Sequence, residues 1–263
     1  MQQGQPQEGE EDVDKALEDL EQARKDLEEQ KNELEGLEND ELLVKLETEL
    51  KKIIASQEVI NKTTVDMDGI KKTKGGFERS ELIKLKQLAK QQDALTETLA
   101  IIQKRLDEEE VWAFAHVVAS VIGDMKSSAE LVGGGQTGDY TQLLQTDIIK
   151  RLQDLVDAFK DEREKKKKKG GGGGGGGGGK PPLVPDIVQL RMLRTMQRDI
   201  LKRTEGFKQT FGKEGEDLDP LEKQILRRLT SEQGKLGDLM KKFTEKFEKS
   251  LEEQKNMERE RQH

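Results

Sequence analysis

The residue types that perform nucleophilic or acid–base chemistry are scarce in this sequence. It contains no cysteine and two histidines, His116 and His263. Such chemistry ordinarily needs His, Cys or paired carboxylates held in a concave, partly dry pocket. His116 lies between Ala115 and Val117 in the most apolar stretch of the chain, and His263 is the last residue. We therefore interpret His116 as a core or boundary side chain, and we expect the protein not to be an enzyme.

Residue spacing predicts no metal site, no cofactor and no small-molecule substrate. Neither histidine has a second His or a Cys nearby at the spacing of zinc ligands. The glycine-rich segment 133–138 resembles a phosphate-binding loop, but it lacks the Lys-Ser/Thr end of that motif and follows a predicted helix. The carboxylates often have a lysine three or four residues away, as solvated charges on helix surfaces usually do.

A run of five lysines is the densest cluster of a single charge: Lys165, Lys166, Lys167, Lys168 and Lys169. Such a run can bind the phosphates of nucleic acid or of an anionic membrane surface. The run contains no aromatic or arginine side chain, and ten glycines follow it directly. We therefore favour a solubilising hinge and keep binding to nucleic acid or an anionic membrane surface as the alternative.

The composition favours long helices with narrow apolar stripes. Only 32% of the residues are apolar, 38% are charged and 3% are aromatic, whereas an average globular chain is about half apolar and about a quarter charged. A thick core is therefore not expected. Residues this sparse can still be buried along helices, because a heptad stripe needs about two apolar positions in seven.

The sequence shows no membrane span and no secretory leader. No run approaches roughly 18 consecutive apolar residues, and residues 1–11 lack the basic and apolar regions of a leader. We expect a soluble chain. The Gln-rich opening is typical of a flexible start, so we expect a periplasmic or exported location if a leader was removed, and a cytoplasmic one otherwise.

Apolar residues recur at alternating intervals of three and four through most of the chain, which is typical of helices. We predict an all-α fold of antiparallel, heptad-patterned helical hairpins joined by a flexible poly-Gly linker. Trp112 and His116 share one face of the most apolar helix, and we expect that face to be largely buried. The predicted parts are an acidic helical arm at 1–39, a hairpin plus two further helices at 40–164, a disordered Lys/Gly/Pro linker at 165–182, a second hairpin at 183–251 and a frayed tail at 252–263.

Charge is unevenly distributed along the chain. Residues 1–50 hold 18 acidic and 5 basic residues, a net charge of −13, which leaves +5 for the remainder. The leucine stripe of the arm is thin, with Arg24 and Lys31 at two of its positions, so the arm is expected to be a marginal helix alone. Gly36 and Asn39 predict a break before the first hairpin.

The two predicted hairpins share one pattern. Five stripe positions of the first helix recur at an offset of 140, and four of the return helix recur at 141, with Gln in the same slot of each helix. These offsets indicate an internal duplication. The matched positions are Leu50, Ile53, Gln57, Ile60 and Thr64 with Leu190, Leu193, Gln197, Ile200 and Thr204, and Leu85, Leu88, Gln92 and Leu95 with Leu226, Leu229, Gln233 and Leu236.

The four glutamines are the candidate interaction residues. In each hairpin the two glutamines lie at nearly equal distances from the turn, so antiparallel packing brings Gln57 level with Gln92, and Gln197 level with Gln233. A Gln pair inside an apolar stripe satisfies its amides mutually and penalises slipped registers. We favour that structural role. In the alternative, one pair stays partly open for a partner helix.

The sequence resembles uncharacterised helical proteins of planctomycete-type bacteria in several places. These are segments 181–185, 189–193 and 197–204, the loop Thr137-Gly138-Asp139 and the leucine-rich acidic arm. The resemblance covers most of residues 40–245. It implies an exported, envelope-associated helical protein, and it carries over no catalytic residue.

These observations predict a non-enzymatic scaffold protein that mediates helix–helix interactions, and the resemblance implies that it belongs to a bacterial envelope complex. Its expected partners are proteins that bind through helical faces, further copies of this chain included. An enzyme would instead need a deep pocket around Trp112 and His116.

Overall fold

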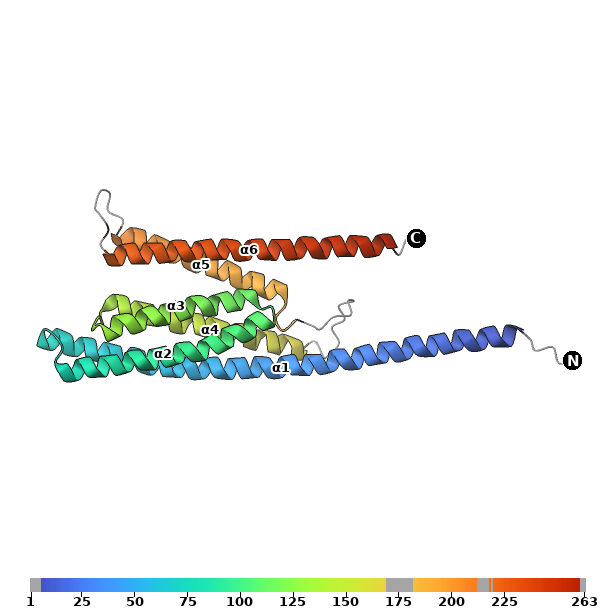
Figure 1. The fold of residues 1–263 in the computed structure, drawn as a ribbon, viewed down its shortest axis with the longest axis horizontal. Helices are drawn as coiled ribbons and strands as arrows, with labels where there is room; N and C mark the ends of the chain where they lie inside the picture. Colours follow the sequence, from blue (N-terminus) through green and yellow to red (C-terminus); the bar gives the residue numbers. More distant parts are fainter. Residues whose placement is uncertain (1–5, 169–181, 212–217, 219, 261–263) are drawn as a thin grey trace.

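The computed structural model is all-α, as the sequence predicts, and it describes residues 6–168, 182–211, 218 and 220–260. Most of the predicted linker, 165–182, lies outside the described residues. Every regular element of the described part is a helix (Figure 1). The helices are α1 (Pro6–Lys74), α2 (Arg79–Glu108), α3 (Trp112–Gly133), α4 (Asp139–Lys168), α5 (Asp186–Phe211) and α6 (Pro220–Glu260).

Four helices form a bundle, in which the second half of α1 packs against α2 and α4 while α3 packs against α2 and α4 (Figure 1). Short turns join consecutive helices, so neighbours in sequence run antiparallel. The turn after α1 uses Gly75 at φ 78°, a conformation that glycine adopts without steric cost. The turn between α2 and α3 places Glu110 at φ 56°, which is unusual for a residue with a side chain.

The most apolar helix, α3, is also the most enclosed, as its sequence predicts. It contacts α2, α4, α5 and α6. Phe114 of α3 stacks on Phe159 of α4 with ring centroids 5.0 Å apart, and both rings are fully buried. Burial of an apolar side chain of this size contributes about 1.5–3 kcal/mol relative to exposure. The bundle is therefore held by an apolar core centred on α3.

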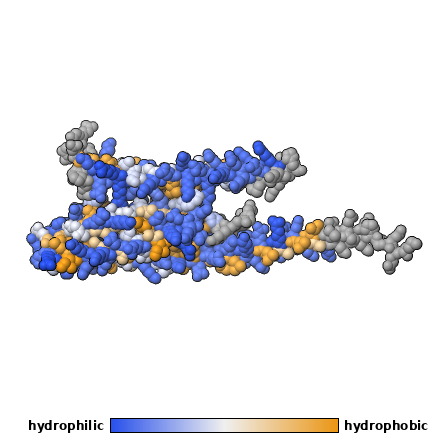
Figure 2. Space-filling model, viewed as in Figure 1, coloured by the Kyte–Doolittle hydropathy of each residue, from blue (hydrophilic) through white to orange (hydrophobic). Residues whose placement is uncertain are grey.

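The acidic arm is a direct continuation of α1, because the predicted break at Gly36 and Asn39 does not occur. One glycine inside a helix costs about 1 kcal/mol relative to alanine, and the strong helix formers on both sides outweigh it. Asn39 is 1% exposed, within the helix where the bundle begins, and does not start a new one. The arm's leucines are exposed and appear as orange patches beyond the bundle in Figure 2.

Helices α5 and α6 form an antiparallel pair that lies on α3, on the side of the bundle opposite α1 (Figure 1). The end of α6 points the same way as the start of α1. Helix α6 continues to Glu260, through most of the predicted frayed tail at 252–263. None of the described helices is both long and apolar enough to cross a lipid bilayer.

Candidate interaction surface

The first glutamine pair lies inside the bundle. Gln57 Nε2 donates to Gln92 Oε1 at 2.8 Å, and Gln92 Nε2 donates to Gln57 Oε1 at 2.6 Å. Gln57 also donates to Asn61 Oδ1 at 2.8 Å, and both glutamines are almost fully buried. The reciprocal bonds satisfy an amide pair that would be costly to bury alone.

Helix α4 and the turn that precedes it cover the same face of α1 beyond the glutamine layer. Gln145 Nε2 donates to Thr64 Oγ1 at 3.0 Å, and Thr137 Oγ1 donates to Asp68 Oδ1 at 3.1 Å. The hydrogen bond from Lys72, supported by the one from Thr137, lowers the pKa of Asp68 below its usual range, although burial acts in the opposite direction. The stripe of the α1–α2 pair is thus closed by other helices of the chain.

The second glutamine pair lies at the surface. Gln197 and Gln233 exchange two hydrogen bonds of 3.2 Å, and both side chains are exposed. The structure therefore brings together both pairs that the sequence singles out, but it buries only one of them. The residues around the exposed pair form what we call the outer face of α5–α6: Leu190, Gln197, Thr204, Leu226, Gln233, Met240 and Phe247.

Burial differs consistently between matching positions. Leu85, Leu99 and Leu106 of α2 are 0% exposed, whereas the α6 residues at an offset of 141 are 38% exposed at Leu226, 45% at Met240 and 38% at Phe247. The adjacent stripe positions of α5–α6 do not differ in this way, because they are buried against the bundle, and most of their counterparts in α1–α2 are buried as well. Those buried residues are Leu193, Ile200, Leu229 and Leu236.

Two glycines follow Gln233 on α6, so no side chain projects from the helix at these positions. Gly234 and Gly237 have nothing within 4 Å of the position that a Cβ would occupy. Each glycine costs about 1 kcal/mol inside a helix relative to alanine, and no close approach within the described part of the chain accounts for either one.

Basic side chains flank the outer face. Positions three or four residues from an outer-face residue lie beside it on the helix surface, and the position next to it in sequence lies about 100° around the helix, on the flank of the face. Seven of these positions carry exposed basic residues that form no ion pair within the described part of the chain. Two exposed carboxylates, Glu205 and Glu248, share the flanks, so the net charge there is positive. The basic residues, which we call the basic rim, are Arg191, Arg194, Arg198, Lys208, Lys223, Arg227 and Lys241.

The first four residues of the lysine run belong to a helix, because α4 continues through Lys168. Lys166 Nζ donates to the carbonyl oxygen of Leu183 at 3.3 Å, which ties the end of α4 to the segment before α5. Lys165 is exposed, and the side chains of Lys167, Lys168 and Lys169 lie outside the described residues. The structure therefore assigns one of the five lysines an internal contact.

A buried polar junction attaches α5–α6 to the bundle. The carboxylate of Asp124 in α3 is fully buried and forms ion pairs with Arg151 of α4 and Arg228 of α6. Buried charges require such pairing, since desolvation of an isolated charge is very costly.

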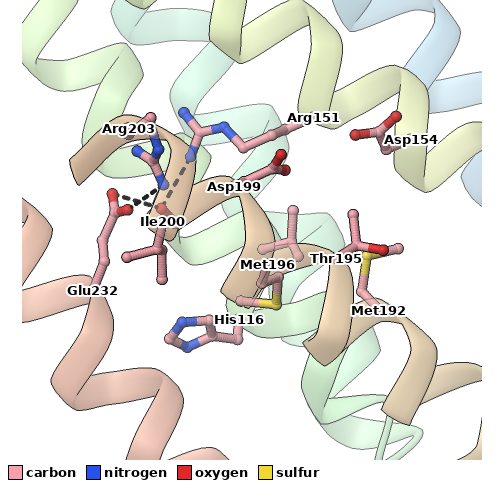
Figure 3. Close-up of a pocket in the computed structure, with 12 residues that line it drawn as sticks. His116, Arg151, Asp154, Met192, Thr195, Met196, Asp199, Ile200, Arg203 and Glu232 are labelled. Atoms are coloured by element: carbon pink, nitrogen blue, oxygen red, sulfur yellow. Dashed lines mark hydrogen bonds and ion pairs between the residues drawn. The ribbon is translucent and has the colours of Figure 1, made fainter. Parts of the chain in front are cut away.

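The junction extends to α5 through Glu232 of α6. Glu232 accepts a hydrogen bond of 3.2 Å from Ser120 Oγ and forms an ion pair with Arg203 (Figure 3). Arg151 Nη1 donates to Ser120 Oγ at 3.0 Å. Side chains from four helices therefore meet in one network, and paired charges of this kind favour one arrangement of helices more than they add stability.

His116 lines a small cavity beside this network, together with Met192 and Met196 of α5 (Figure 3). The cavity holds about 30 Å³, room for about two water molecules. Burial, and then the nearby charge of Lys235, lowers the pKa of His116, while Glu232 acts in the opposite direction. No three His, Asp or Glu side chains of the described residues are grouped so that they could hold a metal ion.

Trp112 is only partly buried, contrary to the expectation of a largely buried face. Its ring meets Phe243 of α6 edge-on with centroids 5.7 Å apart, and Lys242 Nζ lies 3.7 Å from the ring centroid. Trp112 is only partly buried because it is the first residue of α3, where α3 contacts α6. Trp112 therefore belongs to the contact between the bundle and the α5–α6 pair.

Sequence reasoning missed the junction and also Gln189. This buried residue accepts a hydrogen bond from the backbone N–H of Ala113 at 3.2 Å and donates to the carbonyl of Glu110 at 3.2 Å, so it fixes the start of α5. One signal for the junction was present, because Asp124 is an isolated acid within the most apolar helix. Such an acid predicts a buried partner of opposite charge.

No family model, no curated protein and no solved structure matches this chain.

Proposed function

We propose that this protein is a non-enzymatic scaffold whose α5–α6 hairpin binds partner helices through its outer face. The observation that carries the proposal is the exposed Gln197–Gln233 layer. At the matching positions of the α1–α2 hairpin, the same pattern is enclosed by α3 and α4. We further propose that the two hairpins arose by duplication of one heptad-patterned unit, and that the second copy kept its helix-binding stripe for a partner outside this chain.

The chemistry of the outer face suits a helix. Leucine, methionine and phenylalanine supply apolar area on both sides of the glutamine layer, at the seven-residue spacing of a coiled-coil stripe. A partner that buries this face must supply hydrogen bonds to the amides of Gln197 and Gln233 or accept the cost of desolvating them. The layer thus selects the register and the partner in the way polar core positions do in coiled coils.

Binding to nucleic acid or an anionic membrane through Lys165–Lys169 is less well supported. Lys166 is used internally, and α4 incorporates the run as far as Lys168. An envelope location for the scaffold rests on the resemblance of segments 181–185, 189–193 and 197–204 to envelope-associated helical proteins.

Site-specific photo-crosslinking in the native cells tests the proposal. A photoreactive amino acid is introduced at Met240 or at Gln233, and a matched probe at Ile101, which is 70% exposed on α2 and lies outside the outer face. We expect crosslinked species at Met240 and Gln233 that map to a helix of another polypeptide and are absent at Ile101. Equal crosslinking at all three positions would contradict the proposal. Salt-sensitive retention on heparin that disappears when the five lysines are replaced by serine would favour the alternative.

A further inference from the structure

The acidic arm is a long helix with an unpaired apolar stripe. Its leucines are between 55% and 67% exposed, and successive leucines lie three or seven residues apart on the helix. Residues 1–38 hold 14 acidic and 4 basic residues. A helix of this kind, apolar on one line and acidic around it, is suited to a groove that is apolar at its centre and basic at its rim. The exposed leucines are Leu17, Leu20, Leu27, Leu34 and Leu37.

The outer face of α5–α6 has that complementary chemistry. Its centre carries Leu226, Met240 and Phe247, and the basic rim lies on both flanks. The dimensions also agree. At 1.5 Å per residue, the stripe from Leu17 to Leu37 is about 30 Å long, and the distance from Leu226 to Phe247 along α6 is about 32 Å.

The arm cannot reach the outer face of its own chain. Because α1 is one unbroken helix, the arm continues straight out of the bundle, and α1 and α5–α6 lie on opposite sides of α3 (Figure 1). The outer face lies on the solvent side of the contact between α5 and α6, since Leu193 and Leu236, which neighbour it on the two helices, are the residues buried against the bundle. A second molecule is therefore required.

Two arms are poorly suited to pair with each other. Each is strongly acidic, and like charges brought together along an interface oppose association. Pairing of an arm with the basic rim instead places opposite charges side by side over the length of both stripes.

We infer that the acidic arm of one copy of this chain docks on the outer face of α5–α6 of a second copy. This inference rests on the proposed function, because it names the partner of the same face. Arm docking covers the exposed glutamine layer, brings the basic rim against carboxylates, and gives Gly234 and Gly237 a helix to lie against. The interface is salt-sensitive, since its rim charges remain close to solvent.

Analytical ultracentrifugation of the full chain and its variants tests the inference between about 1 and 200 µM, a range that reveals dissociation constants near 10 µM. The arm variant is Leu27→Asp with Leu34→Asp, and the rim variant is Arg194→Glu with Arg198→Glu. All four side chains are exposed, and circular dichroism verifies the helical content of each protein. The matched control is Lys62→Glu with Lys86→Glu, two exposed lysines of the bundle outside the outer face.

We expect the wild type and the control to self-associate, and either variant to associate at least about tenfold more weakly, because misplaced charges cost more than the 1.4 kcal/mol that corresponds to that factor. A mixture of the arm variant and the rim variant should recover a heterodimer, since one intact arm then meets one intact outer face. Adding Glu28→Arg and Glu29→Arg to the rim variant should also restore association.

A wild type that stays monomeric over the whole range, a rim variant that associates like the wild type, or a mixture that does not recover would overturn the inference. The proposed function fails separately. If Met240 crosslinks to a helix of a different protein while the chain is monomeric, the outer face is a docking site and the arm is not its occupant. If Met240 crosslinks no more than Ile101, the outer face is not a docking site at all.

Discussion

The α1–α2 pair and the α5–α6 pair have the same stripe spacing and a glutamine layer in the same place, yet one layer is enclosed and the other is exposed. The difference does not lie in the stripes. It lies in the helices that cover them, since α3 and α4 close the first pair and no described helix closes the outer face of the second. A heptad stripe therefore specifies that a face will pack against helices, but not which molecule supplies them.

The two pairs also differ in how they are attached to the rest of the chain. Both pairs share the apolar core around α3, and α5–α6 is attached in addition through the charged junction at Asp124 and the partly exposed contact at Trp112. Apolar burial contributes stability in proportion to area. A paired-charge junction contributes mainly to specificity. The junction accordingly adds specificity to an attachment of α5–α6 that apolar burial also stabilises.

The largest effect is expected from equivalent truncations in the two pairs. Leu85→Ala should lower the free energy of unfolding by about 2–5 kcal/mol, because it opens a cavity in an enclosed stripe. Leu226→Ala, at the matching position but 38% exposed, should cost less than about 1 kcal/mol in dilute protein. Urea unfolding followed by circular dichroism measures both. Equal costs would mean that the outer face is already buried in the isolated molecule.

Breaking the glutamine layers sharpens the same comparison. Gln57→Ala leaves the buried amide of Gln92 unpaired, which should cost about 1–3 kcal/mol. Gln197→Ala leaves Gln233 in contact with water, and the expected cost is below about 0.5 kcal/mol. The measurement is again the urea midpoint, with Ser56→Ala, an exposed neighbour of Gln57, as the control. A large cost at Gln197 would contradict an open layer.

Trp112→Ala tests the attachment of α5–α6. The change removes one aromatic contact with Phe243 and one cation–π contact with Lys242, so about 1–2 kcal/mol should be lost. Hydrogen exchange should accelerate in α5 and α6 and stay slow in α2, because the contacts that Trp112 loses are with α6. Uniform acceleration in all helices would show that the pair and the bundle unfold as one unit.

The smallest effect concerns the protonation of His116. Burial lowers its pKa in the folded protein below the ordinary 6.5, so the unfolded chain binds a proton first as the pH falls. The stability linked to neutral His116 is fully present above pH 6.5 and is lost as the pH falls through the folded-state pKa. His116→Gln should reduce the dependence of the thermal midpoint on pH between 7 and 5. An unchanged pH dependence would show that other groups control it.

The features predicted from the sequence are those that depend on local spacing. Helices and their stripes follow from residues three and four apart, and the contacts Gln57–Gln92 and Gln197–Gln233 follow from distances to one turn. The break at Gly36 was predicted wrongly, because neighbouring helix formers outweigh one glycine. The junction around Asp124 could not be located, since its partners come from helices far apart in the sequence.

The continuity of α1 gives the arm a mechanical property as well as a chemical one. An unbroken helix is a rod of fixed length and fixed rotation, and each residue advances it by 1.5 Å and turns it by about 100°. The leucine stripe of the arm is therefore oriented relative to the bundle by the number of residues between them. Insertion of one residue near Gly36 would turn the whole stripe by more than a quarter of a circle, whereas insertion of seven would move it outward by about 10 Å and leave its direction nearly unchanged. The arm thus behaves as a spacer whose length can vary only in steps of a heptad if it is to present the same face.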